Sequence, residues 1–169
     1  FFESGQFAQS IRPEMAGRAP ADGKITGFAK LDGREVAVVS NDFTVMGASS
    51  SDVNIAKVGH VKRVATSRGL PMVFLGESTG ARMPDVMGAV SIIGGHRPTQ
   101  YRRTRETPWV SAVLGHCYGS SSWYAALADF VVMRKGAVMA VSSVKLTSMA
   151  ISEAMEPEDL GGWRMHAEV

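Results

Sequence analysis

The fold is decided by one stretch, Gly115-His116-Cys117-Tyr118-Gly119-Ser120-Ser121-Ser122-Trp123-Tyr124. It follows an apolar, strand-like run over residues 109–114 and leads into a helical pattern that reaches Asp129. A strand that breaks at glycines and continues as a helix leaves backbone N–H groups without partners at the helix start. Such groups attract negative charge and stabilise an oxyanion without any charged or nucleophilic side chain. We therefore expect a turn over Gly115–Ser120 that forms half of a site for an oxyanion.

A second turn of the same kind occurs earlier in the chain. Met72-Val73-Phe74-Leu75 predicts a buried strand and runs directly into Gly76-Glu77-Ser78-Thr79-Gly80-Ala81-Arg82. If the two strands are neighbours, both turns open at the same edge of the sheet and their amides converge on one point. Small residues are also common in ordinary loops of α/β proteins. The pattern thus leaves open both a two-sided oxyanion site and two unrelated loops.

The other patterns predict alternating strands and helices, which is typical of a layered α/β fold. Asp32-Gly33 favours a tight hairpin between strands over 24–30 and 35–40. A helix begins after the N-cap candidates Ser49-Ser50-Ser51-Asp52 and ends at Gly69. The apolar stripe expected on this helix comprises Val53, Ala56, Val61, Val64 and Ala65, with Lys57 on another face. Further elements are expected as a mainly helical segment over 83–106, strands over 130–133 and 138–141, and a helix over 144–155.

The composition is that of one globular domain. The 169 residues, 45% of them hydrophobic and 20% charged, suffice for one domain with a core. A net charge of +2 gives no overall attraction to nucleic acid or membranes, and no apolar run approaches the ~18 residues of a membrane helix. The single cysteine excludes an internal disulfide and fits a reducing compartment, the cytoplasm or a mitochondrial matrix. Because the chain starts at Phe1 without methionine, we expect a part of a longer protein.

Five blocks of sequence carry a family resemblance. They are Asn41–Ala48 (NDFTVMGA), Glu77–Arg82 (ESTGAR), Gly115–Ser120 (GHCYGS), Ala128–Val131 (ADFV), and Asp159–Gly162 (DLGG) with His166. In the same order, they resemble (N/Q)DFT(V/F)xGG, (D/N)SGGAR, GPCAGG, TDF and ELGGA..H of the biotin-dependent acyl-CoA carboxyltransferases. These are the carboxyltransferase subunits of propionyl-, methylcrotonyl- and acetyl-CoA carboxylases. The blocks cover nearly the whole chain.

The resemblance implies a crotonase-like spiral of ββα units, with residues 1–169 as the N-terminal half of a two-domain subunit. In that family this half holds the acyl-CoA, and carboxybiotin enters at an interface with the C-terminal half of another subunit, commonly in a hexamer. The cofactors implied are biotin, carried on a partner, and coenzyme A as part of the substrate. The partners implied are a biotin carboxyl carrier and a biotin carboxylase.

The resemblance also implies roles for individual residues. Gly119 and Ser120 match the oxyanion-hole pair, and Gly80 and Ala81 form the facing turn. The residues implied to bind substrate are Ser78, Thr79, Arg82, Cys117 and Tyr118.

The chain departs from the family pattern at several of these positions. Ser120 and Thr79 replace glycines, and His116 and Tyr118 replace proline and alanine. The family's Gly-Pro near the last helix is Ser143-Val144. An N–H survives the replacement of glycine by serine, so an oxyanion hole remains possible, while the added side chains narrow the pocket. The departures leave open a shifted acyl preference, a decarboxylase or an inactive relative.

Other chemistries are also open on the sequence. Gly76–Gly80 fits G-x-S-x-G, so a serine esterase with Ser78, Asp129 and His166 is an alternative, although Pro84 interrupts the helix that should follow. Cys117 beside His116 is a candidate thiolate, but a lone cysteine among small residues is more often packing. A non-catalytic scaffold that binds acyl-CoA is a further alternative.

A basic cluster comprises His96-Arg97 and Arg102–Arg105. It is interpreted either as a surface that attracts CoA phosphates or an acidic carrier protein, or as a solvated helix face. The spacing of His60, His96 and His166 does not match a metal site, and none is expected.

Overall fold

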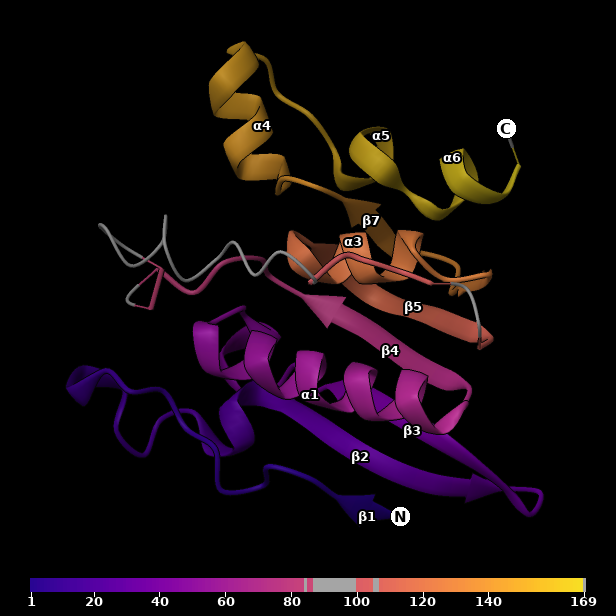
Figure 1. The fold of residues 1–169 in the computed structure, drawn as a ribbon. Helices are drawn as coiled ribbons and strands as arrows, with labels where there is room; N and C mark the ends of the chain where they lie inside the picture. The colour runs from indigo at the N-terminus through magenta and orange to yellow at the C-terminus, as the bar shows by residue number, and fades with distance from the viewer. Residues whose placement is uncertain (84, 87–99, 105–106, 169) are drawn as a thin grey trace.

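The computed structural model describes residues 1–83, 85–86, 100–104 and 107–168, and it is built around one twisted sheet (Figure 1). In spatial order its strands are β1 (Phe2–Glu3), β2 (Lys24–Leu31), β3 (Arg34–Asn41), β4 (Met72–Ser78), β5 (Trp109–Tyr118) and β6 (Phe130–Met133). β7 (Val138–Ala140) pairs with the later part of β5. The first three strands are antiparallel, whereas β3, β4, β5 and β6 are parallel. Parallel neighbours end at the same edge, and this places the two glycine turns together.

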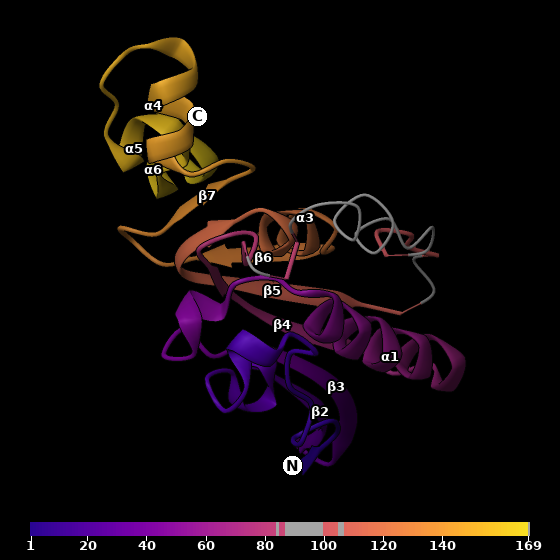
Figure 2. The same ribbon diagram turned by 90° about the vertical axis from the view of Figure 1, so that its left-hand side faces the viewer.

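Helices pack on one face of this sheet and beyond its β7 end. They are α1 (Asp52–Arg68), α3 (Ser120–Ala126), α4 (Val144–Ile151), α5 (Pro157–Gly161) and α6 (Trp163–Ala167), with short 3-10 turns η1 (Pro13–Met15), η2 (Pro20–Gly23) and η3 (Met46–Ala48). α1 lies along β2 and β3, and α3 lies against β4 and β5. The last three helices gather beyond β7, away from α1 (Figures 1 and 2). No described helix is long and apolar enough to cross a membrane.

The local signals at the hairpin and at the first helix are confirmed. Asp32 and Gly33 both have positive φ, 49° and 80°, as a two-residue turn between β2 and β3 requires. Ser51 caps α1 by accepting from the Asn54 amide, and the Asn54 side chain accepts in return from the Ser51 amide. Gly69 ends the helix in the left-handed conformation.

The expected buried face of α1 is partly wrong. Val53, Ala56 and Val64 are only half-buried, whereas Asn54 and Lys57 are buried. The Lys57 ammonium donates to the carbonyls of Ala21 and Lys24 at 2.6 and 2.5 Å. Burial lowers the pKa of Lys57. Two polar side chains therefore occupy core positions because they satisfy backbone groups of distant segments.

Both strands that lead to the glycine turns are longer than expected. Gly76–Ser78 belongs to β4 and Gly115–Tyr118 to β5, so these residues are not part of the turns. The two strands keep pairing through a register shift that brings Ser78 opposite Cys117. A Cβ on Gly115 would overlap the Glu77 carboxylate, so glycine here permits close approach rather than a turn. The last predicted helix is also shorter and ends at Ile151.

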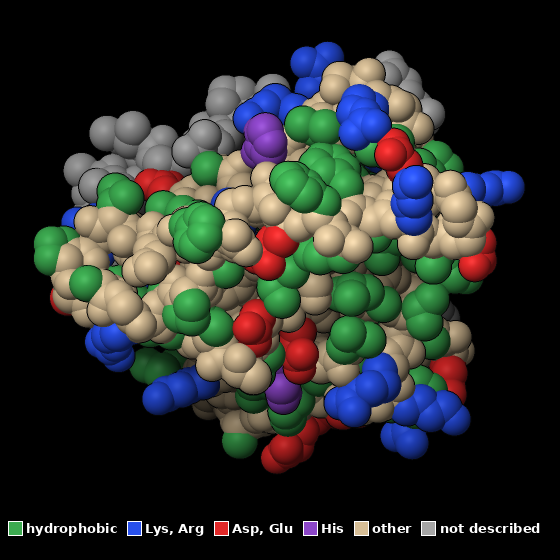
Figure 3. Space-filling model, turned by 90° about the horizontal axis from the view of Figure 1, so that it is seen from below, with side chains coloured by type: hydrophobic (Ala, Val, Ile, Leu, Met, Phe, Trp, Pro, Cys, Tyr) green, Lys and Arg blue, Asp and Glu red, His purple; other side chains and the backbone are tan. Residues whose placement is uncertain are grey.

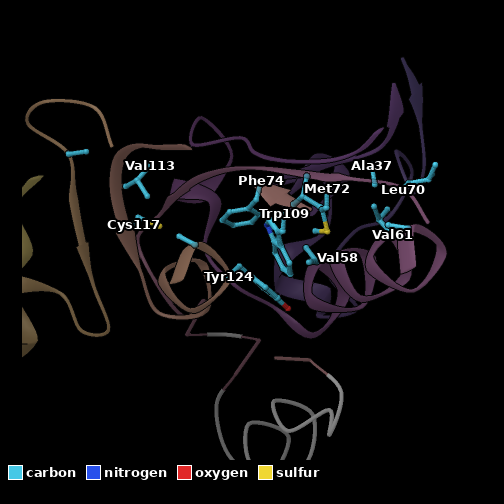
Figure 4. Packing of buried hydrophobic residues seen from close by; sticks show 14 residues of the cluster. Ala37, Val58, Val61, Leu70, Met72, Phe74, Trp109, Val113, Cys117 and Tyr124 are labelled. Atoms are coloured by element: carbon cyan, nitrogen blue, oxygen red, sulfur yellow. The ribbon is translucent and has the colours of Figure 1, made fainter. Parts of the chain in front are cut away.

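The hydrophobic core lies between the sheet and the helices. Phe74 of β4, Trp109 of β5 and Tyr124 of α3 are buried and lie side by side (Figure 4). Their ring centroids are 5.6 Å apart for Phe74 and Tyr124, and 6.2 Å apart for Trp109 and Tyr124. This aromatic cluster attaches α3 to both strands that lead to the glycine turns.

Two surface features contrast with each other. On the face seen from below in Figure 1, basic, acidic and hydrophobic side chains are interspersed (Figure 3). By contrast, β6 exposes an apolar run, with Phe130, Val131 and Val132 accessible to 63%, 40% and 50%. Within the described residues, β6 lies at the edge of the sheet and pairs with β5.

Replacing Asn54 with alanine should lower the free energy of unfolding by about 2–3 kcal/mol, because buried backbone groups lose their partners. The Asn54 amide donates to the carbonyls of Asp22 and Ser49 at 3.0 and 2.8 Å and accepts from the Ser51 amide at 3.0 Å. Urea unfolding of the variant measures the loss. Ser67→Ala, on the exposed part of α1, is the matched control and should change stability by less than about 0.5 kcal/mol. Equal losses in the two variants would contradict the role assigned to Asn54.

Candidate active site

The turns that follow β4 and β5 are in contact. A methyl group built on Gly119 would lie 3.3 Å from the Gly80 Cα and 4.0 Å from the Ala81 amide nitrogen. Gly119 has a φ of 63° and a ψ of −132°, a conformation that side chains oppose. Both the close approach and the backbone conformation therefore require glycine at this position.

The four backbone amides of these turns differ in whether they are already bonded. The Gly80 N–H donates to Ser78 Oγ, and the Gly119 N–H donates to the Val141 carbonyl, both at 3.1 Å. For the Ala81 and Ser120 N–H groups, the described part of the chain supplies no acceptor. The donors that remain for an oxyanion are thus one from each turn, rather than the full set of four.

The turn after β4 is held in place by a buried ion pair. The Arg82 guanidinium, 2% exposed, pairs with the fully buried carboxylate of Asp22. It also donates to Ser49 Oγ and to the Ser49 carbonyl, at 3.1 and 3.0 Å. Arg82 was expected to bind substrate, but its burial and these contacts commit it to the protein itself. In the structure, Arg82 therefore supports the neighbouring Ala81.

Asp22 was not found from the sequence. It lies in the turn η2 with a φ of 53°, accepts from the Ser51 hydroxyl, and its carbonyl accepts from the Asn54 amide at 3.0 Å. A buried carboxylate is stable only when it is paired and hydrogen-bonded, and here both conditions are met. The available signal was weak, since Ala21-Asp22-Gly23 after a proline is typical of an ordinary surface turn.

Three further residues expected at the site lie beneath the surface. Ser78 is fully buried and donates to the Ala48 carbonyl at 3.1 Å, and Cys117 is fully buried in the core. Tyr118 is 7% exposed, and its hydroxyl lies 3.1 Å from His116 Nδ1. Burial raises the pKa of Tyr118.

Thr79 is the exposed member of the set expected to bind substrate. Its amide donates to the Gly47 carbonyl at 2.9 Å, which joins the turn to the segment before α1. A Cβ on Gly47 would lie 2.5 Å from the Thr79 methyl carbon, so the two residues are in tight contact.

The residues of the serine esterase alternative do not come together. The Ser78 hydroxyl is buried and bonded to a carbonyl. Asp129 accepts from the Trp109 amide at 2.8 Å and pairs with Arg103, while His166 Nε2 lies 2.9 Å from the Met139 carbonyl. The described geometry therefore contradicts a triad of Ser78, Asp129 and His166.

Arg103 of the basic cluster lies at the opposite end of β5 from the glycine turns. His96, Arg97 and Arg105 fall outside the described residues. Arg103 stacks on Trp109, the first residue of β5, with 5.2 Å between guanidinium carbon and ring centroid. A ten-residue strand is about 30 Å long, so this end is far from Gly119. Arg102 and Arg103 instead border a cavity of about 340 Å³ beside α1.

The residues that the structure describes contain no group of three or more His, Cys, Asp or Glu side chains arranged to hold a metal ion.

Cys117 should be nearly inert toward iodoacetamide at pH 8. Burial raises the pKa of its thiol to about 12, which lowers the thiolate fraction roughly 10³-fold relative to an exposed cysteine. Because the thiolate reacts, the rate should rise about tenfold per pH unit toward that pKa. Mass spectrometry of the alkylated protein measures the rate, with the urea-denatured protein as the control. Alkylation of the folded protein at the denatured rate would contradict the burial of this thiol.

With the geometry described, comparison with known proteins identifies the family. The carboxyl transferase domain matches residues 1–169. The chain is 32% identical over 154 residues to methylmalonyl-CoA decarboxylase subunit alpha of Veillonella parvula, covering 89% of this chain and 30% of that protein. It is 31% identical over 150 residues to the methylmalonyl-CoA carboxyltransferase 12S subunit of Propionibacterium freudenreichii subsp. shermanii, covering 89% and 29%.

The structure is similar to that of transcarboxylase 12S, a hexamer solved with methylmalonyl-coenzyme A and methylmalonic acid bound. The TM-score is 0.86 at 32% identity, over 98% of this chain and 33% of that one. The chain thus spans about a third of the length of these relatives. The α/β, crotonase-like fold expected from the sequence blocks is confirmed, and the chain belongs to the carboxyl transferase domain family.

Proposed function

We propose that residues 1–169 are the acyl-CoA-binding N-terminal domain of a biotin-dependent carboxyltransferase subunit, and that this domain stabilises a thioester enolate. The observation that carries the proposal is that the two turns are in contact and that each has one N–H, at Ala81 and at Ser120, without an acceptor among the described residues. Membership of the carboxyl transferase domain family supports it.

The chemistry requires stabilisation of negative charge on the thioester oxygen. When the α-carbon of an acyl-CoA loses its proton, that oxygen becomes an enolate oxygen. The Ala81 and Ser120 N–H groups are fixed donors that could bind it, and one such donor contributes about 10²–10³ in rate. The bond between the carboxyl carbon and the biotin nitrogen would break, the freed nitrogen would take the α-proton, and the α-carbon of the enolate would form the new bond to the carboxyl carbon.

The two turns offer no further described donor that would hold biotin itself. N-carboxybiotin, when bound, supplies the carboxyl group. Among the described residues, each of the two turns has one N–H without an acceptor, and the acyl oxygen would use both. Membership of the family supports as partners a biotin carboxyl carrier, a biotin carboxylase and further copies of the subunit in a hexamer, in a reducing compartment.

The two amides by themselves determine neither the direction of transfer nor the acyl group. The same enolate forms when a carboxylated acyl-CoA loses its carboxyl group, so carboxylation and decarboxylation use the same donors. Tyr118 and Thr79 add side chains where the family pattern has alanine and glycine. We propose that they restrict the acyl group to a small one, although one methylene is worth only about 1–3 kcal/mol.

Ser120→Pro tests the proposal because it deletes one N–H at the first residue of α3, a position where proline is tolerated. In the full-length subunit, kcat for carboxyl transfer from methylmalonyl-CoA to biotin should fall about 10²–10³-fold. Ser120→Ala is the matched control, because it removes the hydroxyl and keeps the N–H. It should retain at least about ten times the activity of the proline variant.

Two results would count against the proposal. Equal activity of the proline and alanine variants would exclude the Ser120 N–H as a donor. Binding of methylmalonyl-CoA by the parent protein without any carboxyl transfer would support the non-catalytic scaffold instead.

A further inference from the structure

Ser50 contacts both turns of the proposed enolate site. Its amide donates to the Gly80 carbonyl at 2.7 Å, and its carbonyl accepts from the Arg82 amide at 2.8 Å. These two bonds pair Ser50 with Ala81 as a short parallel bridge. Its hydroxyl oxygen lies 2.5 Å from the hydroxyl oxygen of Ser120. One residue thus joins the turn that carries the Ala81 N–H to the turn that carries the Ser120 N–H.

The direction of the bond between the two hydroxyls follows from burial. Ser50 is 4% exposed, and its hydroxyl has one hydrogen-bond partner among the described residues, Ser120 Oγ. If Ser50 accepted, its own hydrogen would be left buried and unpaired, at a cost of about 1–3 kcal/mol. Ser120 is only partly buried, so its hydroxyl hydrogen can bond to water or to a ligand. The arrangement with the lower free energy has Ser50 donating to Ser120.

We infer that Ser50 is a positioning residue that acts through the Ser120 hydroxyl to fix the separation of the Ala81 and Ser120 N–H groups. The inference rests on the proposed function. The family pattern has glycine at position 120, which offers no hydroxyl for this bond. The coupling is therefore a property of this chain, and it compensates for the serine at that position by holding its side chain to one side.

A double-mutant cycle in the full-length subunit tests the inference. Ser50→Ala, Ser120→Ala and the double variant are compared by kcat for carboxyl transfer from methylmalonyl-CoA to biotin. Calorimetric titration with methylmalonyl-CoA gives the Kd and the fraction of binding-competent protein. Since misplacement by about 1 Å can cost up to 10²-fold, each single variant should lose about 10-fold in kcat. The Kd and the competent fraction should stay within about twofold of the parent.

Non-additivity is the decisive result. If Ser50 acts through the Ser120 hydroxyl, the double variant should lose about 10-fold and no more, because the second substitution removes a bond that is already absent. Ser50→Thr, which keeps a hydroxyl, should recover most of the activity. Ser111→Ala is the matched control, since Ser111 is also fully buried, its hydroxyl has no described partner, and it lies on β5 away from the turns.

Each contrary outcome has its own meaning. Ser50→Ala with parental kcat, or multiplied losses in the double variant, would overturn the role of Ser50 and leave the proposed function intact. A fall in the competent fraction equal to the fall in kcat would reduce Ser50 to a structural residue and also overturn it. Absence of carboxyl transfer in the parent protein would overturn the proposed function and, with it, this inference.

Discussion

The ion pair between Arg82 and Asp22 is the interaction on which the site depends. Two opposite charges in the interior are stable only when their remaining donors and acceptors are also bonded, and truncating one partner leaves an uncompensated charge. Here the additional hydrogen bonds come from Ser49, Ser51 and Asn54, which lie just before α1 or in its first turn. Segments separated by up to sixty positions in the chain are thereby fixed around one guanidinium. This network holds Arg82, and with it the turn that presents the Ala81 N–H.

The sequence was informative where a residue acts on its immediate neighbours. Asp32-Gly33, the Ser51 cap and Gly69 each determine local backbone geometry, and each lies where it was expected. The sequence was uninformative where a polar residue forms hydrogen bonds or ion pairs with a distant segment. Lys57 resembles a solvated helix residue until its two carbonyl acceptors are known, and Asp22 resembles a turn residue until Arg82 is beside it.

The candidate site shows the same division. The strand pattern predicted the two glycine-containing segments, but their meeting at one edge only on the condition that the two strands are neighbours, which the structure confirms. Which amides remain available could not be predicted. The acceptors of the Gly80 and Gly119 amides are a side chain two residues away and a carbonyl beyond β7. Tertiary hydrogen bonds of this kind cannot be predicted from the periodicity of hydrophobic residues in a sequence. A site made of backbone donors is also tolerant of side-chain change, which explains how Ser120 is compatible with the family membership.

The apolar strand β6 has a consequence of a different kind. Among the described strands β6 pairs only with β5, so its other edge is a template to which another strand can add. The run has few of the usual protections, since it contains neither proline nor a charged residue. At high concentration such an edge promotes aggregation through strand addition. Covering this edge is therefore a condition of colloidal stability.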